Sequence, residues 1–327
     1  MSHRERIQAC IKGEATDRPP VALWRHFPVD DQHPETLAAA ALHFQSVYDF
    51  DIMKVTPASS FCVKDWGVDD SWKGHIEGTR EYIQWAIHQP QDWERLPELE
   101  PTAAHLAGQL ECLRLIKENL PSDTPVIQTI FNPLSQAKNL ASPDVLLAHL
   151  REHPEAVMKG LETIAKTTRR FIEAALDVGI DGIFYAVQHA QAEILSLEDY
   201  KKFGLPSDLQ TLEPMSDSRA WCNMIHLHGK NVHFSLLDSF DFQIVNWHDR
   251  ETHPSLAEAQ KIFNGVVCGG LRQDFLVYEK RNEVKKEAAD AIKQTNGKRF
   301  ILGTGCVVPV IASHGNLLAA RESVYNK

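Results

Sequence analysis

The chain has 327 residues, of which 43% are hydrophobic and 24% are charged, a composition that excludes a fibrous or disordered chain. The net charge of −10, without any run of lysine or arginine, argues against nucleic acid as a partner. No apolar run approaches the roughly 18 residues of a membrane span, and the first residues lack the apolar core of a signal peptide. Six scattered cysteines indicate reduced thiols rather than a disulfide framework, so we expect a cytoplasmic location.

The first third of the chain alternates short helices and strands. Helices are predicted over residues 3–13, 34–48 and 102–119, and strands over 21–26 and 51–56. Between residues 61 and 90, aromatic residues lie among glycines and charged residues, which favours a β-hairpin insertion.

From residue 125 onward the alternation becomes regular. Apolar runs predict strands over 125–131, 181–187, 221–228, 242–248, 265–271 and 299–304. The segments between them predict helices over 134–150, 154–178, 276–294 and 316–325. Ser196 and Ser255 each precede an acidic residue by three positions, which is the pattern of a capping box at a helix start.

Eight strands are therefore predicted, and a helix follows nearly every one. Their continuous apolar runs are typical of parallel strands that are buried on both faces. Eight such units favour a single (β/α)₈ TIM-type barrel domain over residues 1–327, since no internal repeat or linker divides the chain. A doubly wound open sheet is the alternative, but no glycine-rich phosphate fingerprint follows the first strand.

Active sites of such barrels lie at the carboxyl ends of the strands. The polar residues at the predicted ends are Arg25, His26, Gln188, His189, His226, His228, Trp247, His248, Arg272, Thr304 and Cys306. We therefore expect a site for a small-molecule substrate among these residues.

Two of the predicted strand ends carry residues that suit a metal ion. His226 and His228 are two positions apart and project from one face of their strand. With Cys306, two imidazoles and a thiolate make a zinc-binding set with one open position, provided that the two strand ends meet across the barrel mouth. The alternative is a hydrogen-bonded histidine pair without metal, with Cys306 as a small buried residue.

Other side chains leave two interpretations open. Arg25 either binds a substrate carboxylate or forms a surface salt bridge. The role of Arg272, which follows Gly269 and Gly270, is left open in the same way. His189 and His248 are expected to lie beside the substrate rather than on the metal.

Several segments resemble the uroporphyrinogen decarboxylase family, which also contains zinc-containing, corrinoid-dependent methyltransferases. The resemblance runs over nearly the whole chain and depends on Asp17-Arg-Pro-Pro20, Asp51-Ile-Met53, Asp181-Gly-Ile-Phe184, Ile225-His-Leu-His-Gly229 and Leu302-Gly-Thr-Gly-Cys306. It implies a (β/α)₈ barrel, in agreement with the strand count.

The decarboxylase branch is matched at few positions. The resemblance aligns the essential aspartate of that branch with Asp51, although the start of a strand is the opposite end from a barrel active site. Only one arginine, Arg25, remains near the first strand, whereas a substrate with many carboxylates needs several. Asn139, Gln188 and Thr304 stand where decarboxylases have a tyrosine, a serine and a histidine.

The methyltransferase branch is matched more closely. It implies zinc at His226-Leu-His228-Gly229 and Gly305-Cys306, with His228 in place of a cysteine ligand. Our hypothesis is zinc-dependent methyl transfer between a corrinoid, free or on a carrier protein, and a small thiol acceptor. The alternatives are a cofactor-free decarboxylase of uroporphyrinogen or a related acid, and a non-catalytic ligand-binding protein. Whether the protein forms a homodimer is left undecided by the sequence.

Barrel position and resemblance together give the candidate site residues. The metal candidates are His226, His228 and Cys306. The catalytic candidates are Asp51, Arg25, His26 and Gln188. The substrate-binding candidates are Trp24, His189, His248, Arg272 and Thr304.

Overall fold

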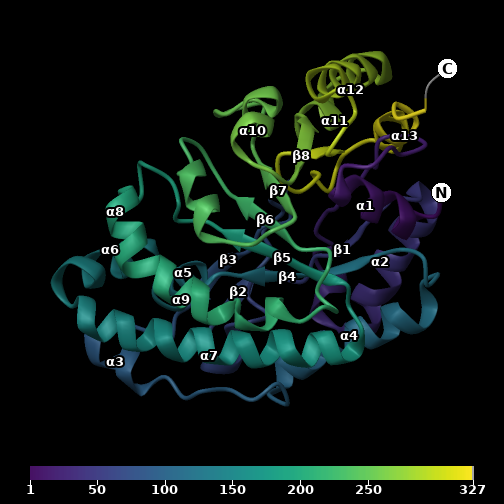
Figure 1. Cartoon of the computed structure of the whole chain (residues 1–327). Helices are drawn as coiled ribbons and strands as arrows, with labels where there is room; N and C mark the ends of the chain where they lie inside the picture. The colour runs from purple at the N-terminus through teal and green to yellow at the C-terminus, as the bar shows by residue number, and fades with distance from the viewer. Residues whose placement is uncertain (326–327) are drawn as a thin grey trace.

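Seven parallel strands form the central sheet of the computed structural model, which describes residues 1–325 (Figure 1). They are β1 (Met53–Val55), β4 (Val126–Phe131), β5 (Gly182–Val187), β6 (Met224–Leu227), β7 (Ile244–Trp247), β8 (Val266–Leu271) and β9 (Phe300–Thr304). Neighbours in the sheet follow the chain order, and every residue of these strands is buried. These strands lie where the sequence predicts them, because apolar runs covered on both faces favour parallel pairing.

The barrel closes through the short segment of residues 20–22. Val21 forms a parallel bridge with Leu302 of β9, and the amide of Ala22 donates to the carbonyl of Leu302 at 2.9 Å. On the other side, the amide of Asp51 donates to the carbonyl of Val21 at 2.8 Å. The predicted strand 21–26 is therefore reduced to one bridge, and the amide of Val21 donates to the Asp51 side chain at 2.8 Å instead of to a neighbouring strand. The TIM-type barrel predicted from the sequence is confirmed.

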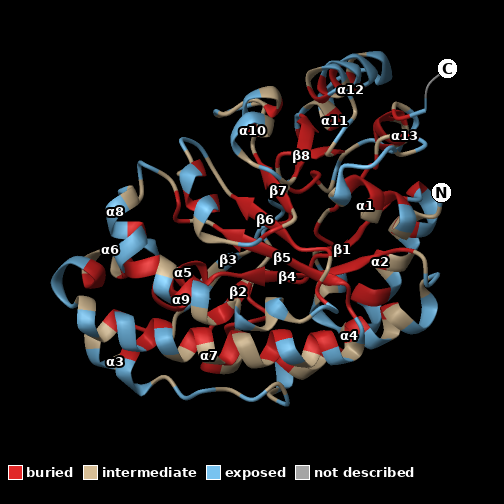
Figure 2. Cartoon of the chain, in the orientation of Figure 1, coloured by how far each residue is buried: buried red, intermediate tan, exposed pale blue. Residues whose placement is uncertain are grey.

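The helices surround this sheet (Figure 2), with buried faces toward the strands and exposed faces outward. They are α1 (His3–Lys12), α2 (Pro34–Tyr48), α3 (Pro90–Arg95), α4 (Ala104–Asn119), α5 (Pro133–Ala141), α6 (Pro143–Glu152), α7 (Pro154–Val178), α8 (Leu197–Asp199), α9 (Leu205–Thr211), α10 (Leu256–Ile262), α11 (Phe275–Tyr278), α12 (Arg281–Thr295) and α13 (His314–Glu322).

Two predicted helices are divided: the segment 276–294 forms α11 and α12, and the segment 134–150 forms α5 and α6. The segment 134–150 breaks at Ser142, which adopts a φ of 77° and separates α5 from α6. Pro143 excludes a helical conformation at the preceding residue and lacks an amide hydrogen, so it begins a new helix rather than continuing the old one. The Ser142 hydroxyl accepts from the amide of Val145 and caps that new helix.

The predicted hairpin insertion is confirmed. Strands β2 (Asp69–Ser71) and β3 (Glu81–Gln84) pair antiparallel. Arg80 anchors the hairpin through ion pairs with Asp31 at 3.2 Å and Asp70 at 3.0 Å. At the tip, the amide of Val310 donates to the carbonyl of Ile76 at 2.7 Å. The hairpin tip therefore lies against the loop that follows β9, beside the barrel mouth.

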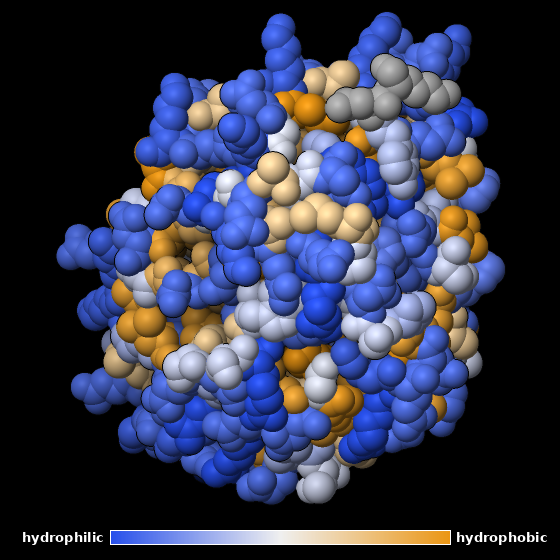
Figure 3. Space-filling view, turned by 45° about the vertical axis from the view of Figure 1, so that its right-hand side comes forward, coloured by the Kyte–Doolittle hydropathy of each residue, from blue (hydrophilic) through white to orange (hydrophobic). Residues whose placement is uncertain are grey.

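Hydrophilic residues cover most of the face seen in Figure 3, and hydrophobic residues show as small separate patches. Among the helices of residues 1–325, none combines the length and the hydrophobicity that crossing a bilayer requires.

Candidate metal centre

Four side chains with metal-binding atoms meet at the carboxyl-terminal mouth of the barrel. They are His226, His228, His248 and Cys306, and their ligand atoms all lie within 4.8 Å of one another. His226 belongs to β6, while the others directly follow β6, β7 and β9. Because parallel strands end at the same edge, residues distant in the sequence converge there. The structure thus brings together the three metal candidates and adds His248, which we expected beside the substrate.

The distances within this group suit one tetrahedral ion. The Nε2 atom of His226 lies 3.4 Å from Nδ1 of His228, and Sγ of Cys306 lies 3.8 Å from the same Nδ1. In a tetrahedral zinc site with bonds of about 2.0–2.1 Å to nitrogen and about 2.3 Å to sulfur, two nitrogens lie roughly 3.4 Å apart and nitrogen and sulfur roughly 3.6 Å. The two distances therefore agree with that geometry to within a few tenths of an ångström, and the donor set fits zinc.

Asn246 fixes the orientation of His226. The amide nitrogen of Asn246 donates to the carbonyls of Cys268 and Thr304, both at 3.0 Å. Its side-chain oxygen must therefore be an acceptor, and it lies 2.7 Å from Nδ1 of His226. Nδ1 of His226 consequently carries the hydrogen, and Nε2 presents a lone pair to the other donors.

Burial keeps the imidazoles of the group neutral. It lowers the pKa of His228 to about 3 and lowers the pKa of His226 and of His248. Neutral imidazoles are the form that binds a metal. Burial also raises the pKa of the Cys306 thiol to about 12, so a cation is needed before this sulfur becomes a thiolate.

Aromatic rings and one lysine line the barrel interior next to this group. The ring of Phe184 stacks on His226 with centroids 5.2 Å apart, and Trp24 meets Phe184 edge-on at 5.3 Å. The ammonium group of Lys54 lies 4.4 Å from the centre of the Phe184 ring and donates to the Thr56 hydroxyl at 3.2 Å. Burial lowers the pKa of Lys54 to about 7. The sequence reasoning missed Lys54, although a lysine inside a fully buried strand was itself a signal.

Several buried polar atoms around the mouth have no hydrogen-bond partner within residues 1–325. Those belonging to the predicted site residues are Trp24 Nε1, His26 Nδ1, His189 Nδ1 and His248 Nε2. Buried polar groups normally have partners, and these four atoms are available to a ligand bound at the mouth.

Gln188 and His189 lie on the side of the mouth formed by β5. The ammonium group of Lys138 in α5 donates to the side-chain oxygen of Gln188 at 2.8 Å. After the larger effect of burial, the charge of Lys138 further lowers the pKa of His189 and of His228. Lys138, which the sequence reasoning did not single out, therefore lies near both. Thr304 serves the site through its backbone, because its carbonyl holds Asn246.

Three predicted site residues lie elsewhere. Asp51 sits at the amino end of β1, fully buried, in ion pairs with Arg6 at 2.7 Å and Arg18 at 2.6 Å. This is the opposite end of the barrel from the metal candidates, so the geometry makes Asp51 an anchor for the N-terminal segment. Arg272 pairs with Glu287 at 3.0 Å on the outer side of the barrel.

Arg25 points away from the barrel interior. Its neighbours Trp24 and His26 take the inward positions, so alternation along the extended segment directs Arg25 outward. There its guanidinium carbon lies 5.1 Å from the centre of the Phe27 ring and 5.7 Å from that of Phe44. It lines an open groove of about 710 Å³ beside α2 and not the metal centre.

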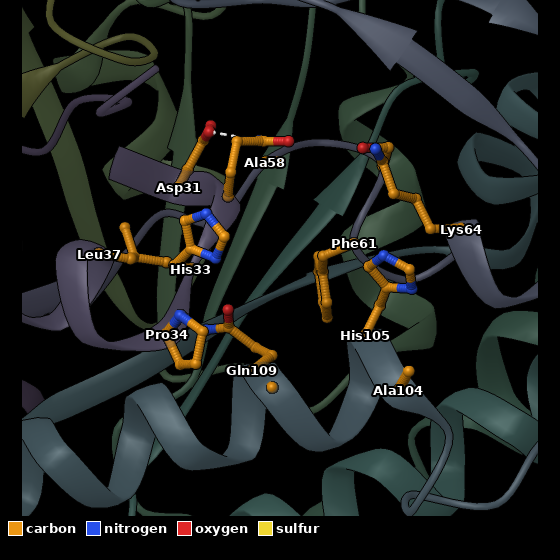
Figure 4. A pocket seen from close by; sticks show the side chains of 13 residues that line it. Asp31, His33, Pro34, Leu37, Ala58, Phe61, Lys64, Ala104, His105 and Gln109 are labelled. Carbon is orange, nitrogen blue, oxygen red and sulfur yellow. Dashed lines mark hydrogen bonds between the residues drawn. The ribbon is translucent and has the colours of Figure 1, made fainter. Parts of the chain in front are cut away.

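A smaller pocket of about 140 Å³ lies between α2, α4 and the segment that follows β1 (Figure 4). Asp31, Lys64, His105 and Gln109 are among the residues that line it. His105 pairs with Asp65 at 2.7 Å, and Asp31 pairs with Arg80. None of the candidate site residues lines this pocket, so we place the site at the barrel mouth.

Comparison with known proteins supplies relatives over most of the chain. It is 25% identical over 222 residues to methylcobamide:CoM methyltransferase MtaA of Methanosarcina barkeri (strain Fusaro), and this match covers 66% of the chain and 63% of the relative. The chain thus spans about 63% of the MtaA length in this match. It is 19% identical over 345 residues to methylcobamide:CoM methyltransferase MtbA of Methanosarcina acetivorans, covering 99% of the chain and 97% of the relative.

Solved structures share the fold. A methyltransferase from Methanosarcina mazei superposes with a TM-score of 0.85 over 100% of both chains, at 18% identity. A B12-independent methionine synthase from Shewanella sp. W3-18-1 gives a TM-score of 0.61 at 13% identity, over 89% of this chain and 85% of that chain. The model of the uroporphyrinogen decarboxylase (URO-D) family matches residues 2–326. The chain is a member of the uroporphyrinogen decarboxylase family.

Proposed function

We propose that this protein transfers a methyl group between a corrinoid, free or on a carrier protein, and a small thiol acceptor, using zinc bound by His226, His228 and Cys306. The observation that carries the proposal is the 3.4 Å and 3.8 Å spacing of these donors at the mouth of the barrel. The relatives support it, because methylcobamide and CoM are both named in their activity.

Zinc at this position would act as a Lewis acid that lowers the pKa of an acceptor thiol. The residues of the chain supply the rest. Asn246 holds His226 in the binding tautomer, and the rings of Phe184 and Trp24 keep water away from the interior side. His248 lies in the same group, and its Nδ1 is 3.7 Å from Glu251, so it would be the donor that gives way to the acceptor.

Methyl transfer breaks the cobalt–carbon bond and forms a carbon–sulfur bond. The methyl group leaves methyl-corrinoid as a cation equivalent, so cobalt keeps both electrons of the broken bond and ends as cob(I)alamin. The thiol loses its proton to solvent, and the thioether is the second product. No oxidant or reductant is consumed, which agrees with a site built of histidine and cysteine alone.

The decarboxylase alternative has less support, because the two residues on which it depends lie outside the barrel mouth. Asp51 lies at the far end of the barrel in ion pairs, and Arg25 points toward α2. A polycarboxylate substrate would need several cationic partners at the mouth.

The test is anaerobic methyl transfer from methylcobalamin to 2-mercaptoethanesulfonate by the zinc-loaded protein, followed by the absorbance change of the corrinoid. We expect zinc-dependent formation of cob(I)alamin and of the S-methyl product, both abolished in Cys306→Ser. A zinc-loaded, folded protein that leaves methylcobalamin unchanged with acidic and neutral thiols would overturn the proposal.

A further inference from the structure

Arg25 is a half-buried cation on the outer side of the barrel, and no acidic side chain of residues 1–325 pairs with it. Its one hydrogen bond within that range runs from Nη1 to the carbonyl of Val310 at 3.1 Å, and its Nε–H is buried without an acceptor. By contrast, the more deeply buried Arg321 pairs with Asp49 at 2.6 Å. Burial disfavours the charged form and lowers the pKa of Arg25. The guanidinium is therefore partly removed from water and lacks a negative charge beside it.

Aromatic rings hold this guanidinium in place. Its carbon lies 5.1 Å from the centre of the Phe27 ring and 5.7 Å from that of Phe44. Phe44 in turn packs on Tyr48, with centroids 4.8 Å apart, and on Phe50 at 5.7 Å. Because these rings restrict the side chain before any ligand arrives, a ligand that pairs with Arg25 loses little free energy in ordering it.

A second hydrogen-bond donor lies in the same groove. The Tyr48 hydroxyl is 2.9 Å from Nδ1 of His314, and both residues line the groove. If the hydroxyl donates to Nδ1, then Nε2 of His314 carries a hydrogen, and if Nδ1 donates, the hydroxyl hydrogen is free. In either arrangement one hydrogen remains without an acceptor within residues 1–325. The groove therefore offers a cation and a further donor to the same ligand.

The rest of the groove is largely apolar and follows one face of α2. This helix contributes Thr36, Ala40, Phe44 and Val47 to the wall, at the three- and four-residue spacing of a single face. These four positions span roughly 16 Å along the helix axis. The volume of about 710 Å³ lies within the range of small-molecule sites. The ring or alkyl chain of a ligand would cover apolar surface that water leaves exposed.

The charges in the groove favour a carboxylate with a single negative charge. A carboxylate matches the planar guanidinium with two parallel hydrogen bonds. Asp30 also lines the groove, but it is exposed and forms no ion pair with Arg25. Its charge would repel a phosphate dianion more strongly than a monoanion. A neutral ligand would leave Arg25 without a counter-charge.

We propose that the groove beside α2 binds an apolar monocarboxylate, with the carboxylate on Arg25 and the ring or alkyl body against Phe44 and Val47. The site lies outside the barrel and is separate from the metal centre, so it does not depend on the proposed methyl transfer. A second copy of the chain is the other occupant that such a surface could take, and the test distinguishes the two.

The first test is titration of 4-fluorophenylacetate with the purified full-length protein, followed by ¹⁹F NMR. The native protein should show saturable binding, which Arg25→Met should weaken about 10- to 100-fold because charge-assisted hydrogen bonds are lost. Val47→Glu is the second variant, since it adds a negative charge to the groove at a residue that is 37% exposed and leaves Arg25 in place. It should also weaken binding. Arg151→Met, at an exposed arginine of α6, is the matched control and should bind as the native protein does.

The second test changes the ligand. The neutral 2-(4-fluorophenyl)ethanol keeps the ring and loses the charge, so it should bind about 10-fold more weakly than the acid, or weaker still. Equal affinity for the two compounds, no saturable binding of the acid, or binding that Arg25→Met leaves unchanged would overturn the inference.

Sedimentation velocity of the native protein and of Val47→Glu examines the other occupant. A native dimer that Val47→Glu dissociates would mean that a second copy of the chain covers the groove, and this result would also overturn the inference. An oligomeric state that Val47→Glu leaves unchanged, together with binding of the acid that depends on Arg25, would establish the carboxylate site. None of these measurements involves methyl transfer, so failure of the groove site and failure of the proposed function are distinguishable.

Discussion

The Nε2 atom of His226 lies 3.4 Å from the Nδ1 atom of His228, which is longer than an ordinary hydrogen bond between nitrogens. Asn246 accepts the Nδ1 hydrogen of His226, so Nε2 has none to give. A direct bond would therefore need His228 to donate, and the separation suits a shared ion better than a shared proton. Metal content is the measurement that distinguishes the metal hypothesis from the hydrogen-bonded histidine pair.

The first prediction concerns metal content. The purified, untagged protein should contain about one zinc per chain, and His228→Ala and Cys306→Ser should each lose it, because only two of the three proposed ligands then remain and His248 is the donor that an acceptor would displace. His248→Ala should retain zinc with weaker affinity, since it removes the fourth donor. Elemental analysis of protein dialysed against a weak chelator measures this.

His253→Ala is the matched control for the metal measurement, because His253 is exposed and lies five residues beyond His248. It should keep the full zinc content. A well-folded native protein that stays metal-free after zinc is added would refute the metal centre itself.

A second prediction addresses the partner of His226. Asn246→Leu removes the acceptor that fixes the imidazole tautomer and should weaken zinc binding about 10- to 100-fold. Competition with a chromophoric chelator gives the affinity. Asn223→Leu is the matched control. Asn223 is a buried asparagine at the amino end of β6, and its side-chain oxygen accepts from the Ile183 amide. The Asn223→Leu substitution should destabilise the fold without changing zinc affinity. Equal losses of zinc affinity in the two variants would mean that Asn246 acts only through the stability of the fold.

A third prediction follows from the buried charge of Lys54. Burial lowers its pKa from about 10.5 in an unfolded chain to about 7 in the fold, so between these values the unfolded state binds more protons. The contribution of Lys54 to the stability of the metal-free protein should therefore rise with pH across this window. Lys54→Met should be more stable than the native protein by about 1–4 kcal/mol below pH 7.

The stability gained by Lys54→Met should shrink as the pH rises from 7 toward 10.5, because the folded lysine is already neutral there and deprotonating it costs less as the unfolded pKa is approached. The buried cysteines, Cys306 among them, have a raised pKa in the fold and therefore lower the stability of both proteins alike above about pH 9, so the difference between the two proteins isolates Lys54. Chemical unfolding at several pH values measures the difference. A constant difference between pH 7 and pH 10 would mean that Lys54 is not buried as a cation.

The barrel could be predicted from the sequence because its strands carry an unambiguous signal. Apolar runs such as 182–187 and 266–271 are buried on both faces, and helices separate them. The first strand was harder to predict, since it pairs only at the bridge of Val21, whose amide donates to the Asp51 side chain. The break at Ser142 could have been read from Pro143, which follows it.

The candidate site could be predicted only in part, because the local sequence does not show which distant residues meet in the folded chain. The pair His226 and His228 is visible from strand alternation, but the approach of His248 and Cys306 depends on how three strand ends close the barrel. Lys54 was hidden for the opposite reason. It lies in the middle of a buried strand, whereas the position of active sites in barrels led us to consider only residues at strand ends. Asp51 was selected by resemblance alone, and the structure puts it at the amino end of its strand.

The last prediction tests whether Asp51 is catalytic or structural. Burial alone would raise the pKa of this carboxyl group, but hydrogen bonds from His3 and Arg18 hold it well below its usual range. Its stabilising effect is therefore present at neutral pH and is lost as the pH falls through the acid range. Asp51→Asn should cost about 3–5 kcal/mol of stability, because it leaves Arg6 and Arg18 without their shared anion.

Zinc content should be unaffected in the folded fraction of Asp51→Asn, since the substitution lies at the other end of the barrel from His226. Asp181→Asn is the matched control, because Asp181 pairs with Arg4 at 2.7 Å at that same end. If both variants lose stability while methyl transfer per folded molecule persists, Asp51 anchors the N-terminal segment against the barrel. The opposite result would be a loss of turnover in Asp51→Asn but not in Asp181→Asn, with native stability and zinc content. That result would show that Asp51 is catalytic, despite its distance from the metal centre.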